Sequence, residues 1–119
     1  MTDEEKLEQF LGTQQHMVLA VTLEDGTPWA VPVKIQQRES LAVFEWDSRL
    51  DTVHSQALKV HPQMALMIYQ KESPWQIGFY AKGHGELVEP SGDYGRYRFT
   101  AEQAWLNDET FVKREVKIA

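Results

Sequence analysis

The chain has 119 residues, 42% of them hydrophobic, and a formal net charge of -6. This length fits a single domain, spanning residues 1–119, with a modest core. The lack of cysteine excludes disulfides, thiolate metal sites and a cysteine nucleophile, and it favours a reducing, cytoplasmic compartment. The acidic charge argues against a nucleic-acid partner, and no apolar run approaches the roughly 20 residues of a membrane-spanning helix.

The N-terminal third of the chain predicts a short helix followed by a β-hairpin. Thr2 and Glu5 have the spacing of a capping box, and Gly12 is expected to end the helix. Residues 16–23 form an apolar, β-branched strand, and an Asp-Gly turn leads into a return strand with alternating faces. Pro32 in that return strand cannot donate to a ladder, so we expect an edge, a bulge or an opening there.

Further strands are expected in the rest of the chain. The runs that predict them are residues 41–46, 64–70, 75–88 and 110–118, with a turn at 71–74. Residues 93–106 are expected to form one or two helical turns. Six or so antiparallel strands with three short helices fit a barrel, because closure removes exposed sheet edges. The predicted fold is therefore mainly β, a β-barrel with short helices.

The long strand at 75–88 contains three glycines, Gly78, Gly83 and Gly85. Glycine weakens the interior of a strand, and it often marks a bulge or a place where something approaches the backbone closely. We therefore expect strong twist, a bulge or the close approach of a flat ligand along this strand.

The segment 47–62 lies where a strand becomes a helix, and it is a candidate anion site. Unpaired amides and the positive end of the helix dipole favour an anion at a helix start. Additional donors come from Ser48, Arg49, Thr52, His54 and Ser55. The alternative is that Ser48 and Asp51 only cap the helix and that Arg49 is a solvated charge.

Three segments in order resemble the pyridoxamine 5'-phosphate oxidase-like flavin-binding split β-barrels. The opening hairpin VLAVTLEDGTPWAVPV (18–33) is similar to that family's apolar strand, D-G-x-P and second proline. The run DTVHS followed by HP (51–62) is similar to D-S-x-H-S-x-N-I and N-P, and FYAKGHGELV (79–88) is similar to the long glycine-bearing strand. The resemblance implies a split β-barrel and a homodimer with two flavin mononucleotide (FMN) sites, each built from both subunits.

The resemblance also implies which residues hold FMN. The strand residues Val31, Pro32, Val33 and Lys34 would lie along the isoalloxazine ring, with Lys34 on the opposite face from Val31 and Val33. The phosphate would meet Ser48 and Arg49, and also Thr52, His54 or Ser55. If Arg49 does so, Arg49→Ala should weaken FMN binding more than riboflavin binding.

The chain departs from the family pattern in its cationic and C-terminal positions. Ala57 stands where the family has asparagine, Leu50 stands where the oxidases carry lysine, and an early arginine-lysine pair is reduced to Lys34. The segment 107–119 lacks a counterpart to the oxidases' substrate-binding arginine and tryptophan. Oxidation of vitamin B6 is therefore not implied.

Aromatic, histidine and carboxylate side chains elsewhere in the chain are further candidates for a site. Among the four tryptophans, Trp105 is chosen as the one that stacks on the flavin. No metal site is expected, because His16, His61 and His84 have no partner at metal-ligand spacing. Glu45 and Asp47 share a strand face, but no sequence rule makes them an acid/base pair. The catalytic residues, if any, are therefore not identified.

The leading functional hypothesis is a flavin-dependent oxidoreductase that acts on a small molecule, with FMN supplying the redox chemistry. The first alternative is a non-catalytic module of the same fold that stores or senses a flavin, or holds haem through His84 or His16. The second alternative is a deazaflavin-dependent reductase. The barrel is small, so a second subunit is expected to cover the cofactor in each case.

Overall fold

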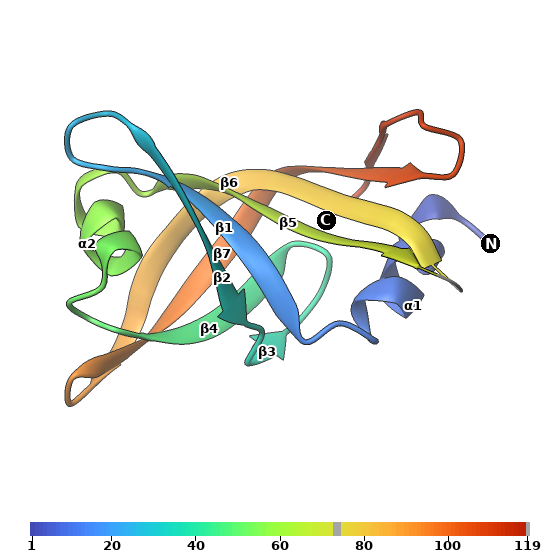
Figure 1. Ribbon diagram of the computed structural model, residues 1–119. Coiled ribbons are helices and arrows are strands. Elements are labelled where there is room, and N and C mark those ends of the chain that lie inside the picture. The colour runs from blue at the N-terminus through green and yellow to red at the C-terminus, as the bar shows by residue number, and fades with distance from the viewer. Residues whose placement is uncertain (73–74, 119) are drawn as a thin grey trace.

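Eight strands and two helices make up the part of the chain that the computed structural model describes, residues 1–72 and 75–118 (Figure 1). In chain order they are α1 (Asp3–Leu11), β1 (His16–Thr22), β2 (Pro28–Lys34), β3 (Gln37–Arg38), β4 (Val43–Arg49), α2 (Val53–Val60), β5 (Gln63–Glu72), β6 (Trp75–Ser91), β7 (Tyr94–Asp108) and β8 (Arg114–Val116). The prediction of a mainly β fold with short helices is confirmed.

The described strands all belong to one antiparallel sheet, in the order β2-β1-β5-β6-β7-β4-β3, with β8 beside β7. The two ends of this order, β2 and β3, are separated in the chain by residues 35–36 alone. Ile35 donates its amide to the Gln15 carbonyl (2.8 Å), and Gln36 donates to the Glu45 carbonyl (2.9 Å). The sheet curls into a split barrel. The expected full closure is wrong, because among the described strands β2 and β3 form the two ends of the order and do not pair with each other. Pro32 lies on the edge strand β2, as expected.

The core fills the inside of the barrel with aromatic and aliphatic side chains. Phe44 packs against Phe79 and Phe99, with ring centroids 5.5 and 6.4 Å apart, and all three are fully buried. Trp46 stacks on Tyr97 at 5.5 Å. Aromatic contacts of this kind add to the free energy that apolar burial supplies.

The helices α1 and α2 lie at opposite ends of the barrel (Figure 1). The predicted capping box of α1 is present: Thr2 accepts from the Glu5 amide, and Glu5 accepts from the Thr2 amide. Its apolar face is buried through Leu7, Phe10 and Leu11. Neither of these two helices is both long and apolar enough to cross a membrane.

The segment 93–106, expected to form helical turns, is instead most of strand β7. Its buried residues alternate up to Ala101 and then alternate again from Ala104. The register with β6 slips between Lys82 and Gly83, so that Glu102 is an extra residue in β7. This bulge shifts the alternation by one position, which breaks the period-2 pattern in the sequence.

Other boundaries also differ from the sequence expectation, among them that of the strand expected at 41–46, which is Val43–Arg49. The last strand is only Arg114–Val116, shorter than the predicted 110–118. The strand β5 continues through Glu72, where a turn was expected, and residues 73–74 of that predicted turn lie outside the described residues. The strand β6 extends to Ser91, and the turn comes at residues 92–93, where Gly92 has a φ of 63°.

A buried carboxylate connects the C-terminal end of β7 to α1. Asp108 accepts from Arg114 (2.9 Å), Lys6 (3.0 Å) and Thr110 (2.7 Å). The Arg114 guanidinium is the largest cause that holds the pKa of this carboxyl far below its usual range, and Thr110 and Lys6 lower the pKa further. The hydrogen bonds of the folded protein therefore stabilise the ionised form of Asp108.

Asp108→Asn is expected to lower the free energy of unfolding by about 2 kcal/mol at pH 7, because it weakens several charge-assisted hydrogen bonds. A depressed carboxyl pKa stabilises the fold fully above the unfolded pKa of about 3.9, and this contribution fades as the pH falls below it. The difference between Asp108→Asn and wild type in urea unfolding should therefore shrink at pH 3. Glu24→Gln, at an exposed carboxylate between β1 and β2, is the control. A difference that stays constant with pH would contradict this assignment.

Candidate functional site

The polar residues predicted at the start of the central helix do lie together, in a network that they satisfy among themselves. Ser48 Oγ lies 2.8 Å from His54 Nε2, and both side chains are buried. Thr52 is the N-cap of α2, where its Oγ1 accepts from the Ser55 amide (3.2 Å). Ser55 Oγ donates to the Arg49 carbonyl (2.8 Å). The expected cap by Ser48 and Asp51 is therefore wrong, because Thr52 has the capping geometry.

Arg49 is held by its own neighbours. Its guanidinium makes two hydrogen bonds to the Asp51 carboxylate, at 3.1 and 3.2 Å, and lies 5.7 Å from the centre of the Tyr94 ring. Desolvation lowers the pKa of His54, so burial favours the neutral imidazole. The start of α2 thus presents an arginine paired with an aspartate and a neutral histidine.

The four residues predicted on β2 divide between two sides of the sheet. Val33 is buried in the core, and Val31 is partly buried against it. Pro32 and Lys34 are exposed on the other side. Backbone pairing with β1 places Pro32 opposite Val18.

Two rows of outward side chains cross the sheet from β2 to β7. Strand register places Ala30, Ala20, Ala65, Lys82 and Gln103 in the first row, and Pro32, Val18, Met67, Tyr80 and Trp105 in the second. We call these ten residues the outer face. An antiparallel sheet around one core usually turns polar residues outward. Here the first row has the small side chains of Ala20 and Ala65 near its centre, and the side chains of the second row are largely apolar. The outer face is therefore suited to contact with another apolar surface.

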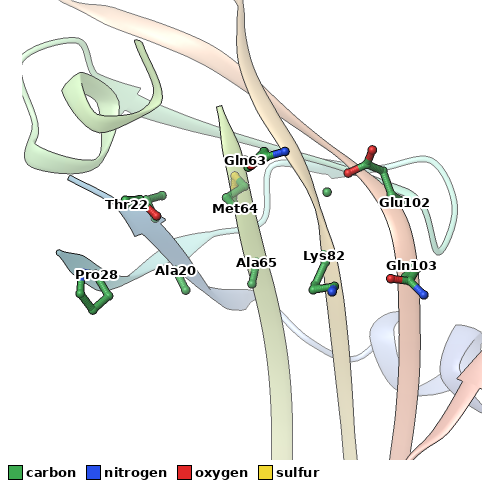
Figure 2. A pocket seen from close by; sticks show the side chains of 11 residues that line it. Ala20, Thr22, Pro28, Gln63, Met64, Ala65, Lys82, Glu102 and Gln103 are labelled. Atoms are coloured by element: carbon green, nitrogen blue, oxygen red, sulfur yellow. The ribbon is translucent and has the colours of Figure 1, made fainter. Parts of the chain in front are cut away.

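Two adjoining cavities hollow the outer face. The larger, of about 620 Å³, is lined by residues of five strands, and Figure 2 shows Ala20, Ala65, Lys82 and Gln103 in line, with Thr22, Gln63, Met64 and Glu102 above them. The smaller, of about 150 Å³, is bordered by Val18, Met67, Tyr80 and Trp105. Both cavities share Ala20, Ala65 and Lys82. Together they have the size and mixed lining of a small-molecule site.

The bulge in β7 shapes one wall of the larger cavity. Gly83 and Glu102 both line it at the point where the register slips. A Cβ on Gly83 would overlap the Thr100 carbonyl oxygen and would lie 2.9 Å from Ala101 Cα. Glycine is thus required here by contact with β7 itself, and a ligand is not needed to explain it.

Charges are few in the larger cavity. Among the described residues that line it, Lys82 is the one cation and Glu102 the one anion. The Lys82 ammonium lies 5.8 Å from the centre of the Trp105 ring, within range of a cation-π contact. Across residues 1–72 and 75–118, no three histidine, aspartate or glutamate side chains are grouped so that they could hold a metal ion.

Comparison with solved structures identifies the fold as that of the pyridoxamine 5'-phosphate oxidase-like split barrels. A Clostridium acetobutylicum protein of the pyridoxinephosphate oxidase family, related to general stress protein 26 of B. subtilis, is similar with a TM-score of 0.81 and 15% identity, over 98% of this chain and 96% of that chain. A haem-binding protein from Mycobacterium smegmatis has a TM-score of 0.82 and 12% identity, over 98% and 58%. HutZ, a haem storage protein from Vibrio cholerae, has a TM-score of 0.73 and 17% identity, over 95% and 96%. The resemblance inferred from the sequence is confirmed at the level of fold.

Sequence similarity adds no further assignment, because no family model matches the chain and no curated protein matches it.

The structure brings together some of the sequence-predicted site residues and separates others. Pro32 and Trp105 share the second row of the outer face, whereas Ser48 and His54 lie in the network at the start of α2. The cavity residues Ala20, Ala65 and Lys82 were missed by sequence reasoning. Small residues at outward positions of apolar strands were the available signal, but the row is visible only once the strand pairing is known.

Proposed function

We propose that this protein is a homodimer that binds a flavin, such as FMN, in the hollow of its outer face and uses it in a redox reaction on a small molecule. The observation that carries the proposal is that two cavities lie side by side on a largely apolar outer face. A flat ligand in this hollow would keep one side in water unless a second copy covered it. The same face would therefore bind the cofactor and form the dimer interface.

The residues of the outer face suit the ring system of a flavin. Ala20 and Ala65 leave a shallow floor, and Tyr80 and Trp105 offer aromatic surface beside it. Gln63 and Gln103 carry amide groups that can donate to and accept from the polar edge of an isoalloxazine. Lys82 lines both cavities, whereas Glu102 lines only the larger one, so beside the floor that the cavities share its positive charge would favour negative charge on a bound ring.

The chemistry would come from the flavin, which transfers hydride or single electrons. The chain's contribution is to position the ring, to set the polarity around it and, through the second copy, to exclude water. Among the described cavity-lining residues, none is required to act as an acid or base for this role.

The absorption spectrum of the purified protein, before and after addition of FMN or riboflavin, tests the proposal. We expect a flavin band that remains with the protein through gel filtration, and a dimer by light scattering at micromolar concentration. Reduction by a nicotinamide donor with turnover would show catalysis. A monomer that retains neither flavin would contradict the proposal.

Haem is a second candidate cofactor, because of the position of His84. His84 is partly buried on β6 and pairs with Gln63, which lines the larger cavity. An imidazole whose strand partner lines a cavity is of the residue type that serves as an axial ligand to haem iron. Two of the similar structures are haem proteins by name. A Soret band that appears on addition of haemin and is lost in His84→Ala would favour haem over flavin.

A further inference from the structure

We infer that this protein recognises the ring of its flavin and not the 5'-phosphate, so that FMN and riboflavin bind with nearly equal affinity. The inference rests on the proposed function and narrows its ligand class. It follows from a disagreement between the phosphate of FMN and the residues at the start of α2, where the resemblance places that phosphate.

The hydroxyl and imidazole groups at this position are already used within the protein. Ser48 is paired with His54 at 2.8 Å, with both side chains more than nine-tenths buried. Thr52 caps the helix, and Ser55 donates to the Arg49 carbonyl. A phosphate that took these donors would leave buried partners unpaired, which costs free energy.

The charged side chains at the start of α2 also provide no net positive charge for a dianion. Arg49 is paired with the exposed carboxylate of Asp51 through two hydrogen bonds, and its guanidinium lies over the Tyr94 ring. Burial lowers the pKa of His54, which favours its uncharged form. A phosphate close to Arg49 would therefore lie close to the Asp51 carboxylate as well, and the repulsion would offset the attraction.

Packing explains why Leu50 and Ala57, which stand where the family has lysine and asparagine, supply no other ligand for a phosphate. Leu50 is partly buried against the core, and its methyl group would lie 2.9 Å from a Cβ placed on Gly95. Ala57 is 4% exposed on the inner side of α2. Both positions are occupied by core contacts, so neither can offer a cation or an amide to a phosphate.

The larger cavity does not provide a phosphate clamp either. Its lining combines one lysine with one glutamate, so the two formal charges cancel. Specific phosphate sites in proteins combine several backbone amides with arginine or lysine. The ring system is thus the part of FMN for which the described residues offer complementary surface.

Titration of the purified protein with FMN and with riboflavin, each followed by flavin fluorescence, tests the inference. We expect the two dissociation constants to agree within about threefold, since one charge-assisted contact to phosphate would separate them by tenfold or more. Arg49→Ala, an exposed change, should leave both constants unchanged. A larger preference for FMN, or a preference that Arg49→Ala abolishes, would overturn the inference. Binding of neither flavin would instead overturn the proposed function.

Discussion

Ala65→Arg is expected to give a folded monomer that no longer binds a flavin. Ala65 stands at the centre of the first row, between Ala20 and Lys82, and both cavities are lined by it. An arginine there would fill the hollow and would place a second cation beside Lys82. Burying an unpaired charge at the centre of an interface costs several kcal/mol, so dimer and cofactor should be lost together.

The measurement is light scattering at micromolar concentration combined with flavin titration, where we expect a halved mass and an affinity reduced by about a hundredfold or more. Gln9→Arg introduces the same side chain at an exposed position of α1 and should change neither quantity. Unchanged circular dichroism would show that Ala65→Arg folds. A dimer of Ala65→Arg that binds flavin normally would show that the outer face forms neither the dimer interface nor the flavin site.

Gly83→Ala is expected to destabilise the protein by about 3 kcal/mol or more. The added methyl group would overlap the Thr100 carbonyl and press on Ala101 Cα, and these are backbone atoms of the neighbouring strand, which cannot rotate away. Relief requires β6 and β7 to separate at the bulge, with loss of ladder contacts. The same movement would displace Glu102 and deform the cavity wall.

Urea unfolding compares Gly83→Ala with Gly12→Ala. The nearest atoms to a Cβ on Gly12 are helix carbonyl oxygens at 3.4 and 3.5 Å, and its φ is -63°, so alanine fits there without strain. We expect a change within about 1 kcal/mol for Gly12→Ala. A loss for Gly83→Ala as small as that would mean that the bulge tolerates a side chain and that glycine is not required at this position.

The sequence was sufficient where structure is decided locally. The capping box at Thr2, the hairpin after β1 and the edge position of Pro32 depend on residues close to each other in the chain, and these predictions are confirmed. The predicted cap of α2 is wrong because strand β4 continues through Ser48 to Arg49 and the helix begins only at Val53, so that Thr52 is the residue before its first turn.

The parts that could not be predicted depend on pairing between distant strands. The bulge at Glu102 prevented β7 from being predicted as a strand. The extra residue moves the buried side chains from odd-numbered to even-numbered positions, which interrupts the alternation. The outer face joins residues from β2, β1, β5, β6 and β7, which are neighbours only through register. Trp105 was chosen from its residue type, and the structure gives it a position beside the cavity of Ala20 and Ala65, but its contact with a cofactor stays a prediction.

Sedimentation equilibrium of the flavin-saturated protein, followed at the flavin absorption band and at the protein band, tests whether one face binds both the flavin and a second copy of the chain. We expect both bands to report a single species with the mass of two chains, and their ratio to give one flavin per chain. Flavin that sediments as a free small molecule above a protein with the mass of one chain would contradict it.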